Sequence, residues 1–216
     1  LTVDISRFEQ HIAYVSAHYV PVSLRKLSHL LESGEKPPER AIVVSFDDSL
    51  RNNIVHALPV LSRFHVRAVF FVIAGRIGQN NRWDTKAFVI EDHMRGEDLT
   101  RLVAEDHELG SHTMTHQRLT KLDAEEVRRE LAESRDAIGN VVGVAPEAVS
   151  YPYGDSNDIC SQICGKYFTF GFTTEREGVF NWCEDRTRIR RIHVSPEDTS
   201  LSLERKIERY RGTRHD

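Results

Sequence analysis

The stretch Ala41-Ile-Val-Val-Ser-Phe-Asp-Asp48 is an apolar run that ends in two adjacent carboxylates, and it begins the unit that decides the fold. Apolar residues then recur at helical spacing between Asn53 and Phe64, and Ala68-Val-Phe-Phe-Val-Ile73 forms a second short apolar run. Runs of this kind are typical of buried parallel strands, and a helical segment between two of them indicates a βαβ unit. The sequence therefore predicts a parallel sheet covered by helices.

The same alternation continues along the rest of the chain. Helical spacing returns at 99–104, and Asp123-Ala-Glu-Glu126 has the pattern of a capping box, which predicts a helix from there to about Gly139. The remaining expected elements are strands at 148–150, 168–173 and 188–194 and an amphipathic helix at 201–210. We expect one α/β domain over residues 1–216, with the active site where successive strands end.

The composition is that of an ordinary globular domain, with 39% hydrophobic and 29% charged residues. Basic and acidic residues are mixed along the sequence and sum to a formal net charge of −4, which gives neither a footprint for nucleic acid nor a polybasic arm. The longest apolar runs, at 41–46 and 68–74, are far too short to cross a bilayer. We expect no nucleic-acid partner and no membrane-spanning segment.

The three cysteines, Cys160, Cys164 and Cys183, form no C-x-x-C pair. We expect them to be reduced thiols, with metal ligation or a single disulfide as the alternative. A chain of this length can bury a sizeable core without such support, so any metal it binds would serve chemistry.

Asp47 and Asp48 follow the first predicted strand. Adjacent strand residues point to opposite faces, so the two carboxylates can share one site only if the chain leaves the strand there. One could then bind a metal while the other takes a proton. The alternative is a pair of turn or cap residues, which is a common use of Asp at a strand end.

His112-Thr-Met-Thr-His116 carries two imidazoles four residues apart, which lie on one face of a helical turn and can reach one divalent cation. The spacing alone is weak, because eleven histidines produce some such pairs by chance. With one added carboxylate, the two imidazoles make a donor set that suits Zn²⁺ and leaves positions for water and substrate. That composition indicates hydrolysis.

Ser150-Tyr-Pro-Tyr-Gly-Asp155 contains Pro and Gly, which predict a turn. The backbone of such a turn could direct an N–H toward a developing oxyanion. The alternative is a surface loop with tyrosines. His193 lies near the end of the predicted strand at 188–194 and is either a proton donor or an ordinary strand-end histidine. Trp83 could border a sugar-binding groove or pack in the core.

Together these segments resemble the NodB-homology polysaccharide deacetylases, carbohydrate esterase family 4, from about Phe8 to Val194. Ser45-Phe-Asp-Asp-Ser49 is similar to the family's T-F-D-D-G motif, and His112–His116 to its H-[ST]-x-x-H motif. Tyr151-Pro-Tyr-Gly154 is similar to its third motif, of the R-P-P-Y-G type. Three motifs in order make the resemblance specific.

The resemblance implies a distorted (β/α) barrel with fewer strands than a complete eight-fold barrel. It implies that Asp48, His112 and His116 hold a divalent metal, with Zn²⁺ expected first and Co²⁺, Ni²⁺ or Mn²⁺ as alternatives. The implied reaction is metal-dependent hydrolysis of N-acetyl groups on the N-acetylhexosamine residues of a polysaccharide or oligosaccharide.

The resemblance also implies the roles of three further groups. Asp47 would be the general base, the main-chain N–H of Tyr153 would complete the oxyanion hole, and His193 would protonate the leaving amine. The implied partner is a glycan. We expect the bacterial cell envelope or the extracellular space if a signal or anchor preceded Leu1, which is not Met, and the cytoplasm otherwise.

Three positions depart from the family pattern. Ser49 replaces a Gly, Arg191 stands where the late L-x-H motif has Leu, and Ser150 takes the place of an Arg that orients the base in relatives, so Asp47 needs another partner. These departures leave two alternatives: a non-catalytic glycan-binding module on the same fold, and a hydrolase of another C–N bond, such as a formamide or cyclic amide.

Overall fold

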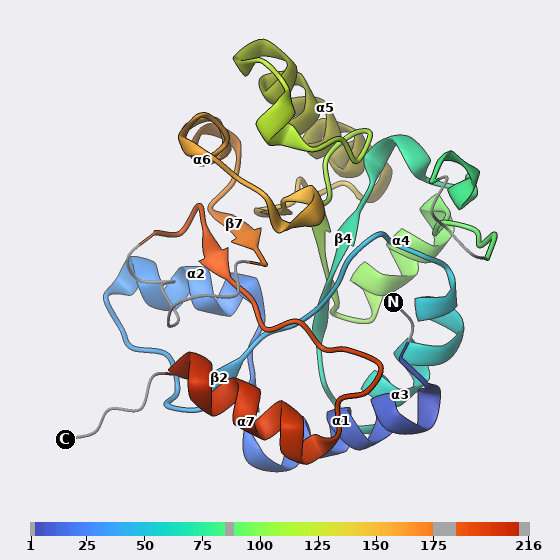
Figure 1. Cartoon of the computed structure of the whole chain (residues 1–216), viewed down its shortest axis with the longest axis vertical. Helices are drawn as coiled ribbons and strands as arrows, with labels where there is room; N and C mark the ends of the chain where they lie inside the picture. The colour runs from blue at the N-terminus through green and yellow to red at the C-terminus, as the bar shows by residue number, and fades with distance from the viewer. Residues whose placement is uncertain (1–2, 85–88, 175–184, 212–216) are drawn as a thin grey trace.

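The computed structural model of the chain describes residues 3–84, 89–174 and 185–211 (Figure 1). Its centre is a curled sheet of six parallel strands in the order β3-β4-β5-β6-β7-β8. The strands are β3 (Val44–Phe46), β4 (Ala68–Val72), β5 (Glu108–Ser111), β6 (Ala148–Ser150), β7 (Phe170–Thr173) and β8 (Ile189–Arg190). Because the strands follow chain order, β3 and β8 are the two edges of an open barrel, as the resemblance implied.

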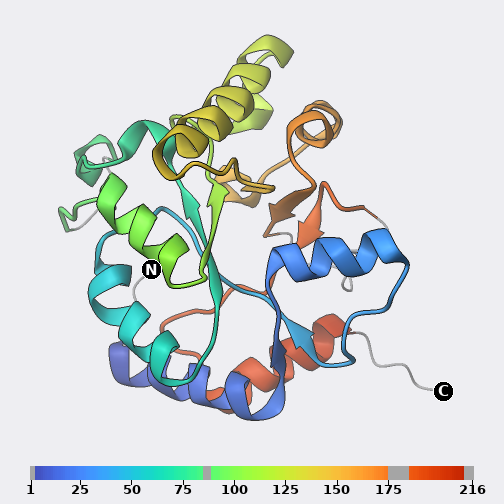
Figure 2. The ribbon, with the colours of Figure 1, turned by 180° about the vertical axis from the view of Figure 1, so that it is seen from behind.

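Helices surround this sheet, as Figures 1 and 2 show from opposite sides. They are α1 (Ile5–His18), α2 (Leu24–Ser33), α3 (Leu58–Arg63), α4 (Gly96–Ala104), α5 (Ala124–Val142), α6 (Asp158–Tyr167) and α7 (Ser200–Arg211). Shorter helical turns are η1 (Asn53–Ala57), η2 (Ala74–Arg76), η3 (Asn81–Trp83), η4 (Leu119–Lys121) and η5 (Pro152–Gly154). The first and last helices, α1 and α7, lie side by side in both views. None of the described helices has the length and hydropathy needed to cross a bilayer.

Strand β4 is buried along its whole length and divides the core in two. Phe70 belongs to the cluster beneath the outer helices, whereas Phe71 belongs to the cluster inside the curled sheet. Leu24 and Leu27 of α2 close that inner cluster. Phe70 also stacks on Phe46 with ring centroids 4.8 Å apart, which fixes β3 against β4 and so fixes where the chain leaves the sheet.

The expected strand at 41–46 is two strands. Ala41–Ile42 (β2) pairs with Val20–Pro21 (β1) in a separate two-stranded sheet, and only β3 joins the barrel. Neither β1 nor the helices α1, α2 and α6 was predicted. The prediction of one long strand was wrong because the apolar run serves two partners in succession.

The capping box was predicted correctly, but the end of the helix was not. Asp123 accepts the Glu126 N–H at 2.8 Å, and Glu126 accepts the Asp123 N–H at 2.9 Å. The helix runs past Gly139 to Val142, and Gly143, at φ 78°, ends it. Gly139 instead leaves room for Ala145, which a Cβ there would approach to 3.3 Å.

The other expected elements are confirmed within a few residues. Strands β4, β6 and β7 and helices α4 and α7 occur where the sequence indicated them. The last predicted strand is shorter than expected, because only Ile189–Arg190 pairs with β7.

Candidate active site and metal centre

Asp47 and Asp48 lie where the chain leaves β3. Asp48 has a φ of 67° and Ser49 a φ of 49°, so the backbone turns sharply at this point. Non-glycine residues adopt this conformation only when the surroundings impose it. The chain therefore leaves the strand at this point, as a shared site requires, and both carboxylates can face the same site.

The structure brings Asp48, His112 and His116 together. Asp48 Oδ1 lies 3.4 Å from Nε2 of His112 and 3.4 Å from Nε2 of His116. One ligand atom from each residue lies within 4.8 Å of the other two. Two imidazole nitrogens and a carboxylate oxygen at this separation fit one divalent cation that keeps open positions, as in catalytic zinc sites.

His112 has the environment of a metal-ligating histidine. Its ring is buried, and its Nδ1 lies 2.7 Å from the carbonyl oxygen of Ser150. A carbonyl can only accept, so Nδ1 carries a proton and Nε2 is the ring nitrogen that faces Asp48. A partner of this kind fixes the tautomer and the orientation of a histidine ligand.

The segment from His112 to His116 is an irregular loop, so the helical turn assumed from the spacing is wrong. Thr113 and His116 have positive φ values of 65° and 64°, and the two imidazole centroids are 4.8 Å apart. Glu130 of α5, buried beneath the loop, accepts the N–H groups of Met114 and Thr115 at 2.9 and 2.8 Å. The Glu130 carboxylate thus fixes the loop backbone between His112 and His116, which helps to hold the two imidazoles close together.

The charges around the site favour a bound cation. Burial by itself lowers the pKa of His112, but the carboxylates of Asp47 and Asp48 outweigh it and raise that pKa. Burial and the charge of His112 lower the pKa of His116 to about 4, so this ring is neutral at pH 7. A neutral imidazole and carboxylates that draw positive charge are what a metal site requires.

Asp47 is held by Arg191. Arg191 Nη1 and Nη2 donate to the two carboxylate oxygens of Asp47 at 2.9 and 2.7 Å, and Nη2 also donates to Ser150 Oγ at 2.7 Å. Burial raises the pKa of Asp47, but the Arg191 charge and these hydrogen bonds lower it well below its usual range. The predicted general base is therefore ionised at neutral pH.

Tyr153 lies beside the metal-ligand set in the third motif. Its φ is 61°, and its ring centroid is 5.0 Å from that of His116. Gly154 N–H donates to Tyr151 O at 2.8 Å, which tightens the turn around Tyr153. Arg118 stacks over the Tyr153 ring at 4.5 Å. The third motif thus lies beside His116, and the role of the Tyr153 N–H in an oxyanion hole stays a prediction.

The other sequence candidates have different outcomes. Trp83 contacts the site, since its ring meets His116 edge-on at 5.2 Å and its Nε1 donates to His93 Nε2 at 3.2 Å. His193 is exposed on the half-buried stretch after β8, and its role as proton donor stays a prediction. Cys160 and Cys164 are buried free thiols, as expected, and Cys183 lies outside the described residues.

Three residues of the site were missed from the sequence. They are Arg191, Glu130, and His93, whose Nδ1 lies 2.8 Å from the main-chain oxygen of Asp48. Glu130 had a sequence signal, because it falls between Val127 and Leu131 on the apolar face of α5. Arg191 also had a sequence signal, because it stands where the L-x-H motif of the family has Leu.

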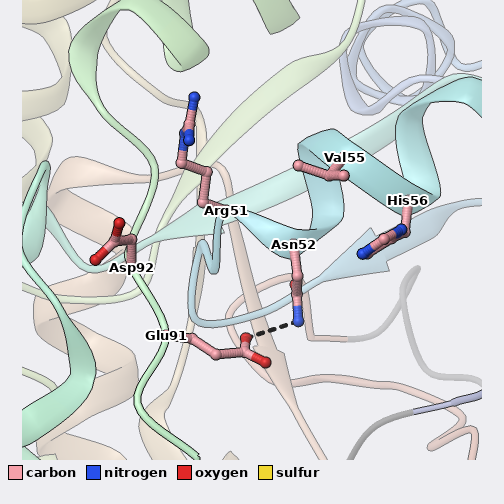
Figure 3. Close-up of a pocket in the computed structure, with 6 residues that line it drawn as sticks. All are labelled: Arg51, Asn52, Val55, His56, Glu91 and Asp92. Carbon is pink, nitrogen blue, oxygen red and sulfur yellow. Dashed lines mark hydrogen bonds between the residues drawn. The ribbon is translucent and has the colours of Figure 1, made fainter.

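A separate pocket of about 290 Å³ lies beyond the turn after Asp48 (Figure 3). Its lining residues are Arg51, Asn52, Val55, His56, Glu91 and Asp92. Asn52 Nδ2 donates to Glu91 Oε2 at 2.7 Å across it. Asp48, His112 and His116 do not line this pocket. The candidate active site is therefore defined by the convergence of their ligand atoms.

The fold and the site together define an α/β barrel with a candidate metal centre at the carboxyl ends of its strands. The chain matches the family described as "Polysaccharide deacetylase" over residues 34–167. The chain belongs to the polysaccharide deacetylase family, which confirms the resemblance seen in its motifs.

Individual relatives agree with this assignment. YxkH of Bacillus subtilis (strain 168) is 26% identical over 198 residues, covering 91% of this chain and 67% of the relative. The poly-beta-1,6-N-acetyl-D-glucosamine N-deacetylase of Staphylococcus aureus (strain MSSA476) is 24% identical over 185 residues, covering 82% of this chain and 63% of the relative. The peptidoglycan-N-acetylglucosamine deacetylase PgdA of Listeria monocytogenes (strain 10403S) is 26% identical over 152 residues, covering 70% of this chain and 28% of the relative.

The same fold occurs in a solved structure, the Streptococcus pyogenes deacetylase PplD in complex with acetate. The TM-score is 0.82 at 22% identity, covering 95% of this chain and 88% of that one. This likeness confirms the predicted fold class.

Proposed function

We propose that this chain is a metal-dependent hydrolase that removes N-acetyl groups from N-acetylhexosamine units of a polysaccharide or oligosaccharide. The observation that carries the proposal is the Asp48, His112 and His116 donor set beside a second, ionised carboxylate at Asp47. Family membership and relatives named as N-acetylglucosamine deacetylases support it.

Asp48, His112 and His116 would hold the divalent cation. Two nitrogens and one oxygen favour Zn²⁺, and Co²⁺, Ni²⁺ or Mn²⁺ are alternatives that the same donors accept. When bound, such an ion lowers the pKa of water from near 16 toward ~7 in favourable sites.

Side-chain and main-chain groups around the donor set supply the remaining steps. Asp47 takes the proton of the attacking water as the oxygen approaches the acetamide carbon. The Tyr153 N–H donates to the carbonyl oxygen as it gains negative charge, and a donor of this kind contributes roughly 3–4 kcal/mol where it has been measured. His193, when protonated, gives its proton to the leaving amine.

Two aromatic rings flank His116 and suit a sugar substrate. Trp83 meets His116 edge-on, and Tyr153 lies on it at a tilt with 57% of its own surface exposed. The faces of a pyranose ring pack well on aromatic side chains, so these rings would hold the sugar that carries the acetyl group.

The test is acetate release from N-acetylglucosamine oligomers by chelator-treated protein, before and after addition of Zn²⁺ or Co²⁺. We expect release only with metal, loss of release in Asp47→Asn, and loss of metal binding in Asp48→Ala. Asp106→Asn, at a carboxylate with 87% of its side chain exposed, is the matched control and should behave as the wild type. Metal binding without acetate release would favour another acyl substrate, and glycan binding without metal would favour the non-catalytic module.

A further inference from the structure

Arg191 joins the two open edges of the barrel. It directly follows β8, whereas its partner Asp47 directly follows β3 at the other edge of the sheet. The chain leaving β8 runs past the end of β3 in Figure 1, and the ion pair at 2.7 Å brings the two segments together. The pair therefore links the two edge strands of the open sheet.

The Arg191 guanidinium is fixed on several sides. Its carbon lies 5.4 and 5.9 Å from the ring centroids of Phe71 and Phe172, and only 15% of its side chain is exposed. Its Nη1 also donates to Ser45 Oγ at 3.2 Å. Buried arginines with bidentate carboxylate contacts orient their partner, because the planar fork fits both oxygens at once.

The hydrogen bonds leave a specific oxygen of Asp47 available for a proton. Oδ2 accepts from Arg191 Nη2 at 2.7 Å and from Ser150 Oγ at 3.3 Å, whereas Oδ1 accepts from Arg191 Nη1 at 2.9 Å. An ionised carboxylate oxygen can accept about two hydrogen bonds, so the remaining lone pair lies on Oδ1.

The sequence departs from the family pattern at the two positions that meet here. Ser150 stands where the resemblance implies an Arg in the third motif, and Arg191 stands where it implies the Leu of the late L-x-H motif. Ser150 and Arg191 touch each other, through Nη2 and Oγ at 2.7 Å. The small Ser side chain leaves the space that the Arg191 guanidinium occupies.

We propose that Arg191 is the positioning residue of Asp47, supplying from the end of β8 the cation that the third motif lacks at position 150, so that Asp47 Oδ1 faces the attacking water. This inference rests on the proposed function. Arg191 acts through Asp47 and takes no part in bond making.

The test compares Arg191→Leu, Arg191→Lys and the exchange variant Ser150→Arg/Arg191→Leu in the metal-loaded acetate assay. We expect Arg191→Leu to lower kcat about 10–100-fold, with KM and Zn²⁺ stoichiometry unchanged. Arg191→Lys keeps the charge but loses the two-pronged contact of the guanidinium, so its kcat should lie between those of the wild type and Arg191→Leu. The exchange variant returns an Arg to the same carboxylate from β6 and should recover kcat above that of Arg191→Leu.

Arg188→Leu is the matched control, since Arg188 lies just before β8 and pairs with the exposed Asp158 of α6. It should keep the wild-type kcat. Thermal unfolding of every variant separates loss of orientation from loss of fold. Wild-type kcat in Arg191→Leu, or a folded exchange variant with no recovery, would overturn the inference alone. No acetate release by the metal-loaded wild type would overturn the proposed function and this inference together.

Discussion

The buried carboxylate of Glu130 accepts the main-chain N–H of Thr115 at 2.8 Å, which places an acidic side chain of α5 directly beneath the loop that carries His112 and His116. The same oxygen accepts the N–H of Met114 at 2.9 Å. Glu130 therefore fixes the backbone between the two histidines.

Replacement of Glu130 by Ala should weaken metal binding. The loop would lose the acceptor of two backbone N–H groups, and His116, with its φ of 64°, would no longer be held in place. We expect Zn²⁺ affinity to fall roughly 10–100-fold, as with other residues that orient metal ligands. Competition with a chelator of known affinity measures it.

The control for this prediction is Glu133→Ala, one turn further along α5 at an exposed position. It should bind Zn²⁺ as the wild type does. Equal affinities for the Glu130 and Glu133 variants would show that the loop holds its histidines without the carboxylate.

His93 should stabilise the turn that carries Asp48. Its Nδ1 donates to the Asp48 main-chain oxygen at 2.8 Å, while its Nε2 accepts from Trp83. His93→Phe keeps a ring of similar size but leaves both partners unpaired in a buried site, which should cost about 1–3 kcal/mol of unfolding free energy. Urea unfolding measures the cost, and His56→Phe, at an exposed position, should change stability little. Equal stabilities of the two variants would contradict the assignment.

The site residues that the sequence identified lie together because of the fold class, whereas those that it missed depend on how the sheet closes. Asp48, His112 and His116 fall at strand ends, and parallel strands bring their carboxyl ends to one edge, so their convergence follows from the fold class. The Arg191–Asp47 pair joins residues 144 positions apart and exists only because the sheet curls until β3 approaches β8. Hydrophobic periodicity shows that strands exist, but it does not show how far a sheet closes.

The break within 41–46 was missed for a related reason. Val20–Pro21 is a two-residue strand with a Pro in it, which no periodicity detects, yet it takes Ala41–Ile42 as its partner. The capping box at Asp123 was found because its donors and acceptors lie three residues apart. Local contacts could therefore be predicted from the sequence, whereas partners chosen by the tertiary fold could not.

Gly154→Ala should disrupt the third motif. Gly154 has a φ of 67°, and a Cβ there would lie 1.8 Å from Thr174 Oγ1. Gly143→Ala is the matched control, because Gly143 has a φ of 78° with nothing within 4 Å of such a Cβ. Gly143→Ala should lower the unfolding free energy by about 1 kcal/mol, which is the cost of placing Ala in the left-handed conformation. Gly154→Ala should cost more and also reduce activity, because Tyr153 precedes it. Equal unfolding free energies of the two variants would show that Thr174 moves aside freely.

Asp198 should make the stability of the protein depend on pH in the acid range. Its side chain is 6% exposed, and its carboxylate accepts from Ser195 N–H at 2.7 Å, Ser202 Oγ at 2.8 Å and the Lys206 ammonium. Burial raises the pKa of Asp198, but these donors lower it by more, to well below its usual range. A carboxyl group with a lowered pKa in the folded state stabilises the fold above its unfolded pKa, near ~3.9, and loses that contribution as pH falls toward the folded value.

Asp198→Asn should therefore lower the unfolding free energy at pH 7 by about 1–3 kcal/mol, the usual cost of removing one partner from buried charged hydrogen bonds. The difference from the wild type should shrink as pH falls below ~4, because Asp198 in the unfolded wild-type chain then begins to take up its proton while the folded carboxylate stays ionised. Urea unfolding at pH 7, 5 and 3 measures this difference. Glu197→Gln, at an adjacent exposed carboxyl, should show no such dependence. A difference between Asp198→Asn and the wild type that is the same at pH 7 and pH 3 would mean that the Asp198 charge does not stabilise the packing of α7.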